Sequence, residues 1–245
     1  MASYPRSGST WLRFLLLELL TDASAGFNQV NRMIPDVGGH RGCQALLAGG
    51  RLIKTHEAYR SVYRKAVYIV RDVRDVVLSE FEYENSRRRI GEDFDTFLML
   101  SLGANVNGYG SWQEHLVSWI DSPLAGSGRL LLIRFEELKS RTEDTLAEVT
   151  DFLGIEADRA AIRRAIANNS LQRMREKEDQ VPVIDGYSTR KTNGNGSRFI
   201  GRGSIGGWRA RLSDEQVRLI ELHAGFGLCR VGYPLETLSE AVSKI

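Results

Sequence analysis

The segment over residues 4–11, YPRSGSTW, combines an arginine, a glycine and three small hydroxyl side chains where a helical pattern begins. The backbone N–H groups of a helix N-terminus are unpaired and carry the positive end of the helix dipole. Small residues let an anion approach that backbone, while Arg6, Ser9 and Thr10 add a charge and two donors. The segment predicts an anion-binding turn, and an ordinary helix start with a serine cap is an equal alternative from these residues alone.

Two further groups of polar residues follow predicted strands. Lys54, Thr55 and His56 close one apolar run, and Arg71 follows another, with Ser79 eight residues later. Ligands of open α/β sheets bind beyond the carboxyl ends of the strands, so these side chains are candidates for one site. A structural histidine and an exposed helix with Arg–Asp pairs are the alternatives.

The elements that must position these residues alternate between strands and helices. This alternation indicates an α/β fold, with a three-layer parallel sheet flanked by helices, in a single domain over residues 1–245. Apolar runs and helical periodicity predict strands over 1–5, 51–54, 66–70 and 130–133, and helices over 9–20, 73–87, 93–121, 142–154, 158–177 and 213–223. Residues 180–207, rich in Gly, Asn, Ser, Arg and Lys, predict a mobile loop.

The composition excludes several classes of protein. With 33 basic and 31 acidic residues among 245, the net charge of +2 argues against a nucleic-acid partner. The apolar run over 11–20 contains Arg13 and Glu18 and is too short to span a bilayer, so no membrane partner is expected. Cys43 and Cys229 lack CxxC spacing and the four histidines lack HxxxH spacing, so we predict reduced thiols, a cytoplasmic location and no metal.

The turn over residues 4–11 is not a Walker A loop, because GxxxxGK[ST] is absent. It resembles instead the 5′-phosphosulfate loop, approximately YPKSGTTW, of the sulfotransferases of cytosolic and bacterial type that use 3′-phosphoadenosine 5′-phosphosulfate (PAPS). That family has a P-loop NTPase-like fold. The resemblance implies that the cofactor is bound by Arg6, Ser7, Gly8, Ser9, Thr10 and Trp11.

The segment from Lys54 to His56 resembles the family's KTH motif, which implies that His56 is the general base on the acceptor hydroxyl. Lys54, with Arg6, then stabilises the leaving 5′-phosphate. Glu57 is a second candidate base, since some carbohydrate sulfotransferases use a glutamate. Residues 71–79 resemble RNxKDVxxS, in which the arginine and serine equivalent to Arg71 and Ser79 hold the 3′-phosphate.

Residues 201–209 are similar to the family segment RKGxxGDWK, which closes over the cofactor. Arg202 and Gly203 match its 3′-phosphate contacts, whereas Gly201 stands in place of the first arginine, and Arg198 is a candidate for the missing charge.

Two other family elements match more loosely. Phe135 takes the place of the tyrosine of the YED turn. Leu171 takes the place of the aromatic residue of a TSF element, so adenine is expected between Trp11 and Leu171.

The resemblance implies an enzyme that moves a sulfuryl group from PAPS to a hydroxyl or phenol of a small-molecule or natural-product acceptor, such as a glycopeptide, and releases PAP without a metal. A P-loop-type small-molecule kinase is one alternative. A non-catalytic nucleotide- or sulfated-glycan-binding module is another, suggested by 27 arginines among the 33 basic residues, although a GC-rich genome also produces that excess.

The surroundings of the acceptor are less defined. Segments 80–122 and 172–200 are expected on the acceptor side, with candidates Tyr83, Tyr109, Trp112 and Tyr187, for which core packing is an equal alternative. Cytosolic family members carry extra residues before the first loop, so either the natural chain starts earlier or the acceptor site is unusually open. A homodimer is one option for the assembly, but the family's C-terminal motif KxxxTVxxxE is not clearly present over 209–218.

Overall fold

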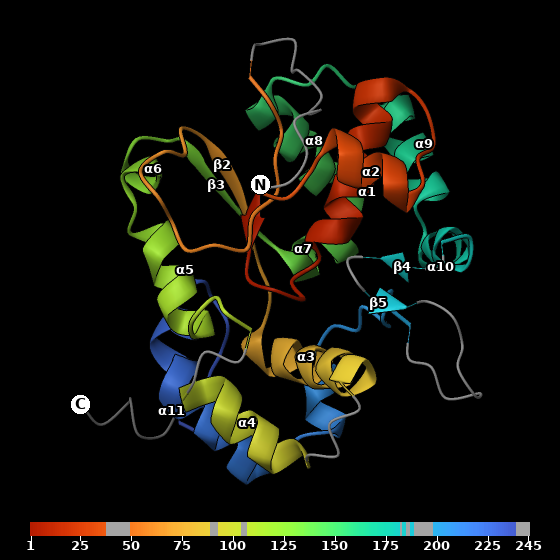
Figure 1. The fold of residues 1–245 in the computed structure, drawn as a ribbon. Coiled ribbons are helices and arrows are strands. Elements are labelled where there is room, and N and C mark those ends of the chain that lie inside the picture. The colour runs from red at the N-terminus through yellow and green to blue at the C-terminus, as the bar shows by residue number, and fades with distance from the viewer. Residues whose placement is uncertain are drawn as a thin grey trace.

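The computed structural model describes residues 1–37, 50–88, 93–103, 107–181, 183–184, 187–188 and 198–238. Within them, a parallel sheet has the strand order β1 (Ala2–Ser3), β2 (Ala66–Val70) and β3 (Leu130–Arg134). A short antiparallel pair, β4 (Val183–Ile184) and β5 (Tyr187–Ser188), stands apart from this sheet (Figure 1). The helices are α1 (Ser9–Thr21), α2 (Phe27–Met33), α3 (Val73–Arg88), α4 (Phe94–Gly103), α5 (Trp112–Ile120), α6 (Pro123–Gly126), α7 (Phe135–Ser140), α8 (Thr142–Leu153), α9 (Arg159–Asn168), α10 (Leu171–Asp179) and α11 (Asp214–Arg230), with a short 3-10 helix η1 (Gly207–Ala210).

Helices cover both faces of the sheet, and β2 shows this through its side chains. Successive residues of a strand point to opposite faces. Val67 and Ile69 join the core formed with α1, α8 and α9, while Tyr68 and Val70 join the core formed with α3, α5 and α11. All five residues of β2 are buried, as expected of a strand covered on both sides. The predicted α/β fold with a flanked parallel sheet is confirmed.

The predicted strand over residues 51–54 is wrong. Among the described residues no strand forms here, and isolated parallel bridges join Ala2 to Thr55 and Asp36 to Lys54. The partner β1 has only two residues, so its pairing with this segment stops after two hydrogen bonds, from Ser3 N to Thr55 O (3.2 Å) and from Thr55 N to Met1 O (3.0 Å). This short pairing still places Lys54 and His56 beside the end of β1.

Two predicted helices are each divided in the structure. The segment over 93–121 forms α4 and α5, separated by a stretch in which Gly108 and Gly110 have positive φ angles of 84° and 79°. The segment over 158–177 forms α9 and α10, because Ser170 leaves the helical conformation and its side chain caps α10 at Arg173 N. Helix α7 follows β3 directly and was not predicted, and α11 continues beyond its predicted end to Arg230.

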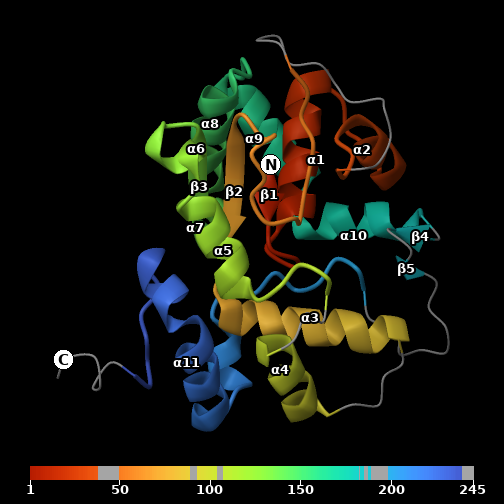
Figure 2. The ribbon, with the colours of Figure 1, turned by 60° about the vertical axis from the view of Figure 1, so that its left-hand side comes forward.

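The parallel strands end at the part of the molecule where the predicted site residues lie. Figure 2 shows β2 directed toward α3, which crosses beneath the ends of the strands. Part of the predicted mobile loop, residues 182, 185–186 and 189–197, lies outside the described residues. No helix in the described ranges is both long and apolar enough to cross a membrane.

Candidate active site

A cavity of about 510 Å³ lies where the strands end, between the turn after β1, helix α3, helix α10 and the segment from Phe199 to Gly203. It brings together nearly the whole predicted set of site residues. Those lining it are Arg6, Gly8, Ser9, Thr10, Trp11, Lys54, His56, Arg71, Ser79, Leu171, Arg202 and Gly203. Ser7 is the exception, since its side chain is fully buried beneath the turn.

The turn between β1 and α1 depends on its glycine. Gly8 caps α1 in the left-handed conformation, with φ 97°, and Arg6 also has a positive φ of 64°. A Cβ atom at Gly8 would lie only 2.5 Å from Cδ2 of Phe135. The backbone of the turn therefore packs directly on the first residue of α7, which keeps the start of α1 open to the cavity.

We expect Gly8→Ala to destabilise the protein by about 2–4 kcal/mol, because both the positive φ and the contact with Phe135 oppose a side chain. Chemical denaturation measures this. Gly128→Ala is the matched control: Gly128 has φ 67° but open space around its Cβ position, so its cost should be only about 1–2 kcal/mol. Equal losses in the two variants would contradict the close packing of the turn.

Arg6 and Ser79 meet across the cavity. Nε of Arg6 donates to Oγ of Ser79 at 3.2 Å, and its Nη2 donates to the carbonyl of Phe199 at 3.4 Å. The guanidinium also lies 4.6 Å from the centre of the Tyr83 ring, and burial lowers its pKa. This arginine thus joins the turn after β1 to α3 and to the C-terminal segment.

Arg71 extends the same cationic cluster. Its Nη1 donates to the carbonyl of Arg6 at 2.9 Å and its Nη2 to the carbonyl of Ser204 at 3.0 Å, while Nε is buried with no hydrogen-bond partner in the described residues. The guanidinium lies 4.7 Å from the Phe135 ring. Burial lowers its pKa as well.

Lys139 is a cavity residue that the sequence analysis missed. Its Nζ donates to the carbonyl of Gly203, and its pKa is lowered first by burial and then by the neighbouring charge of Arg71. Lys139 follows Phe135 by four residues, which places both on the same face of α7. The position of Lys139, four residues after the YED-like turn at Phe135, could therefore have identified it as a cavity residue.

Lys54 has a partner that was also missed. Its buried Nζ lies 3.1 Å from Oδ1 and 3.2 Å from Oδ2 of Asp36, a half-exposed residue that also lines the cavity. The two residues meet through the isolated bridge between their backbones. No local pattern in the sequence connects them, because the pairing is made only in the fold.

His56 is held in one tautomer by β1. Its Nδ1 lies 2.7 Å from the carbonyl of Ser3, which can only accept, so Nδ1 carries the proton and Nε2 carries the lone pair. Burial, followed by the charge of Lys54, holds the pKa of His56 well below its usual range. The imidazole is therefore neutral at physiological pH and has the form that a general base requires.

Glu57, the second candidate base, lies away from the cavity. Its Oε2 accepts hydrogen bonds from the hydroxyl of Tyr63 at 2.8 Å and from Nη1 of Arg60 at 3.3 Å. The arrangement favours His56 over Glu57.

Trp11 and Leu171 both line the cavity next to the turn between α9 and α10. Nε1 of Trp11 donates to the carbonyl of Asn169 at 2.8 Å, which fixes the indole, and Leu171 is 44% exposed. Arg198 does not line the cavity: its guanidinium pairs with Asp179 at 3.0 Å, so it does not supply the charge missing at Gly201.

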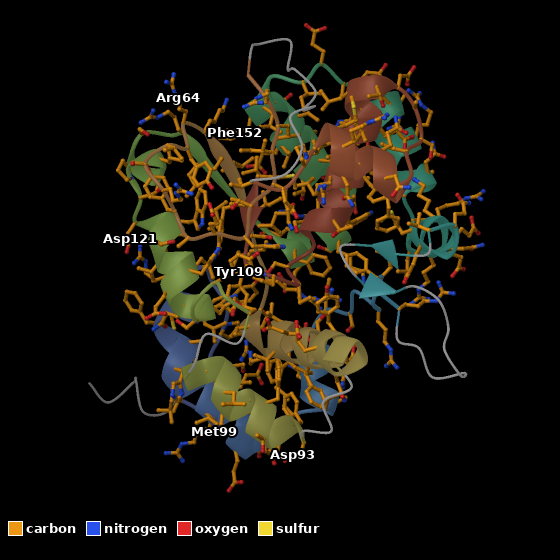
Figure 3. The ribbon with its side chains drawn as sticks, in the orientation of Figure 1. Arg64, Asp93, Met99, Tyr109, Asp121 and Phe152 are labelled. Atoms are coloured by element: carbon orange, nitrogen blue, oxygen red, sulfur yellow. The ribbon has the colours of Figure 1, made fainter. Side chains whose placement is uncertain are left out.

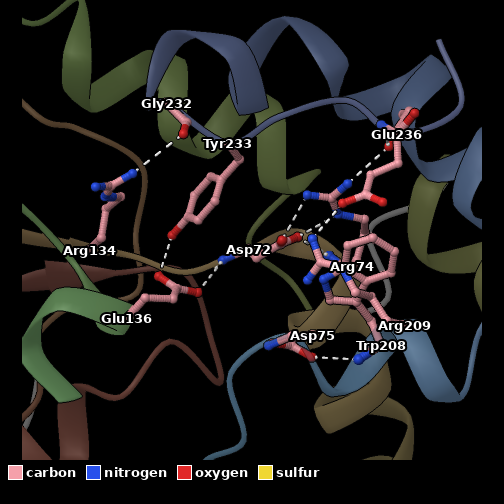
Figure 4. A network of polar contacts seen from close by, with 12 residues as sticks. Asp72, Arg74, Asp75, Arg134, Glu136, Trp208, Arg209, Gly232, Tyr233 and Glu236 are labelled. Atoms are coloured by element: carbon pink, nitrogen blue, oxygen red, sulfur yellow. Dashed lines mark hydrogen bonds and ion pairs between the residues drawn. The ribbon is translucent and has the colours of Figure 1, made fainter. Parts of the chain in front are cut away.

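Two charged residues of the 71–79 motif anchor the C-terminal segment instead of lining the cavity (Figure 4). The carboxylate of Asp75 accepts a hydrogen bond from the backbone N of Gly206 at 2.7 Å. It also accepts one from the backbone N of Trp208 at 3.0 Å, which Figure 4 shows. Arg74 forms a buried ion pair with Asp72 at 2.8 Å, and its guanidinium lies 4.1 Å from the Trp208 ring. These contacts hold the end of the segment that carries Arg202 and Gly203.

The expected acceptor residues separate into two groups. Tyr83 and Tyr109 line the cavity, and Figure 3 shows Tyr109 near the middle of the molecule. Trp112 packs in the core with α11, and the side chain of Tyr187 lies outside the described residues. Glu80 also lines the cavity, where burial raises the pKa of its carboxyl to about 7.

Comparison with known proteins decides the family. The model of the sulfotransferase domain matches residues 1–225. The chain belongs to the sulfotransferase family. The predicted PAPS-dependent sulfotransferase is thereby confirmed at the level of the family, and the kinase and binding-module alternatives lose their support. No group of three or more metal-ligating side chains is present in the described ranges.

The relatives of this sulfotransferase cover most of its length. Mouse sulfotransferase 2A1 is 26% identical, over 89% of this chain and 80% of the relative, and Arabidopsis thaliana cytosolic sulfotransferase 7 is 24% identical, over 91% and 76%. Among solved structures, mouse sulfotransferase SULT7A1 complexed with PAP has a TM-score of 0.67 at 23% identity, over 95% and 87% of the two chains. A retinol dehydratase in complex with retinol and PAP has a TM-score of 0.71 at 18% identity, over 93% and 80%.

Proposed function

We propose that this sulfotransferase moves a sulfuryl group from PAPS to a hydroxyl or phenol of a small-molecule acceptor and releases PAP. One observation carries the proposal. Arg6, Arg71, Lys139 and Arg202 line one cavity, and none of them has a carboxylate oxygen within 4.0 Å in the described part of the chain. Like charges gathered in one cavity repel each other unless an anion joins them, and PAPS carries two anionic centres.

The residues present fit the two ends of that nucleotide. The turn at Gly8 with Ser9, Thr10 and Arg6 suits the 5′-phosphosulfate, because small residues and hydroxyl donors surround the start of α1. Arg71, with its buried and unpartnered Nε, suits the 3′-phosphate together with Ser79 and Arg202. When bound, PAPS supplies the sulfuryl group.

The chain's own residues then handle one proton and one developing charge. We propose that Nε2 of His56 takes the proton of the acceptor hydroxyl, since its lone pair is kept there by the hydrogen bond from Nδ1 to Ser3. Lys54 and Arg6 stabilise the negative charge that gathers at the 5′-phosphate. Asp36 holds the ammonium of Lys54 in place, with its carboxylate 3.1 Å from Nζ.

The test combines binding with transfer. Calorimetry should show PAP binding, and transfer of labelled sulfate from PAPS should occur to members of a panel of phenols, alcohols, steroids and glycopeptides. Phosphate transfer from ATP with magnesium would favour the kinase alternative, and PAP binding without transfer to any acceptor would favour the binding module. Failure of PAP to bind would overturn the proposed function.

We expect Lys139→Met to weaken PAP binding about three- to tenfold, because the variant removes a half-exposed charge beside Arg71 and Gly203. Binding of AMP, which lacks the 3′-phosphate, should change little. Calorimetry with both ligands separates the two effects. Lys65→Met removes an equal charge at the surface over Phe152 and serves as control. Equal losses for PAP and AMP would place Lys139 away from the 3′-phosphate.

The setting of the reaction belongs to the same proposal. We infer a cytoplasmic enzyme, as suggested by the match to a cytosolic sulfotransferase of Arabidopsis thaliana. The acceptor class proposed is a small-molecule or natural-product hydroxyl, and the retinol and androsterone bound by structural neighbours justify including apolar alcohols in the panel. The oligomeric state, monomer or homodimer, is to be determined by measuring the molecular mass in solution.

A further inference from the structure

The proposed base, His56, is held from two sides. β1 holds its ring through the carbonyl of Ser3, and α5 holds its main chain, because the carbonyl of His56 accepts a hydrogen bond from Nε2 of His115 at 3.0 Å. His115 is only 1% exposed and does not line the cavity. Its hydrogen bond to the site is made to the backbone of His56, and its ring also packs edge-on against Tyr4 with the ring centres 5.5 Å apart.

The tautomer of His115 follows from its two partners. A carbonyl only accepts, so Nε2 of His115 carries the proton, and Nδ1 of the neutral ring is then an acceptor. The hydroxyl of Tyr68 lies 2.9 Å from Nδ1 and donates to it. Burial lowers the pKa of His115 to about 4, so the ring stays neutral. Tyr68 lies in the central strand β2, and a chain of hydrogen bonds thus connects the middle of the sheet to the main chain of His56.

The face of α5 that carries His115 also holds residues that follow His56 in the chain. Oγ of Ser118 accepts from the backbone N of Tyr59 at 3.0 Å, and Nε1 of Trp119 donates to the carbonyl of Glu57 at 3.1 Å. Helix positions three and four residues after His115 share its face, so one turn of α5 holds the main chain at Glu57 and Tyr59 as well as at His56. His115 is the member of this group that touches the base residue itself.

We propose that His115 is a positioning residue for sulfuryl transfer: its Nε2–H bond to the carbonyl of His56 fixes the backbone of the base, so that Nδ1 stays on Ser3 and Nε2 stays open to the acceptor. The inference rests on the proposed role of His56. It assigns to α5 a task in the reaction that is separate from nucleotide binding, since the hydrogen bonds of His115 go to Tyr68 and to the main chain of His56.

The test compares three variants of the full chain. His115→Leu removes the donor, His115→Gln keeps an N–H near the position of Nε2, and Trp119→Phe removes the neighbouring bond to Glu57 as a control for general loosening of the loop. Two properties are measured: sulfate transfer from PAPS to an acceptor that the wild type uses, and the histidine side-chain ¹⁵N signals, which report the tautomer of His56 without an acceptor.

We expect His115→Leu to lower kcat about 10- to 100-fold with the acceptor KM and the PAP affinity nearly unchanged. In this variant the ¹⁵N signals of His56 should change from those of the Nδ1–H tautomer to an average of the Nδ1–H and Nε2–H tautomers. His115→Gln should recover most of kcat, and Trp119→Phe should lose no more than about threefold.

Tyr68→Phe provides a milder route if His115→Leu does not fold. It removes only the hydroxyl that orients the imidazole, and a smaller loss of kcat with intact PAP binding is expected. The inference is overturned if His115→Leu keeps the His56 tautomer, or if its loss of kcat equals that of Trp119→Phe. A wild type that transfers no sulfate from PAPS would instead overturn the proposed function.

Discussion

Replacing His56 by alanine should lower kcat for sulfate transfer by about 10²–10⁴-fold while PAP binding stays within about twofold of the wild type. The reason is the arrangement of the ring: Nδ1 bonds to Ser3, so Nε2 has the lone pair, and no other imidazole lines the described cavity. Steady-state kinetics with saturating PAPS and calorimetry with PAP measure the two parts separately.

The matched control is His223→Ala. His223 lies exposed on α11, where its Nδ1 contacts the carbonyl of Leu219, so its removal should leave kcat unchanged. Wild-type turnover in His56→Ala would remove His56 as the base. A parallel loss of PAP binding would show that His56 supports the nucleotide and not the proton transfer.

The pH dependence of kcat follows from the same residue. Burial and the charge of Lys54 hold the pKa of His56 well below 6.5, and a base works only in its unprotonated form. Activity should therefore stay level as the pH falls from 8 to 6.5 and decline only below that range. A decline centred near 6.5 would indicate an exposed, unperturbed imidazole.

Replacing Arg71 by methionine should weaken PAP binding about 10- to 100-fold, because a charge-assisted hydrogen bond to a buried anion contributes about 1.5–3 kcal/mol. Arg71 also joins the carbonyl of Arg6 to that of Ser204, so the variant should loosen the closure of the C-terminal segment over the cavity. Calorimetry with PAP measures the affinity, and protease sensitivity between residues 198 and 208 measures the loosening.

Two control variants test whether the loss of PAP affinity is specific to the guanidinium of Arg71. Arg71→Lys keeps the charge but loses the planar fork, so an intermediate affinity is expected. Arg163→Met removes an equal charge from the exposed face of α9, where the arginine pairs with Glu143, and should bind PAP normally. PAP affinity equal to the wild type in Arg71→Met would exclude Arg71 from the nucleotide site.

Some features of the site could be predicted from residues that are neighbours in the sequence, and others could not. The turn over residues 4–11 could be predicted from neighbouring residues, because a helix start, a glycine with positive φ and hydroxyl donors lie within one short stretch of chain. Short strands were harder to predict from the sequence. Residues 51–54 contain too few apolar residues to define a strand by themselves, and only the two-residue length of β1 decides that they form isolated bridges.

The sequence by itself determined the class of fold, the family and most of the residues that line the cavity, since each motif is contiguous and follows a strand whose end must lie at one edge of a parallel sheet. Tertiary structure alone decided which partner each of these charged side chains meets. It places Asp36 on Lys54, Lys139 beside Gly203 and Asp179 on Arg198. Such pairings join residues 18 to 64 positions apart, and Coulomb forces depend on distance in space, which no spacing along the chain reveals.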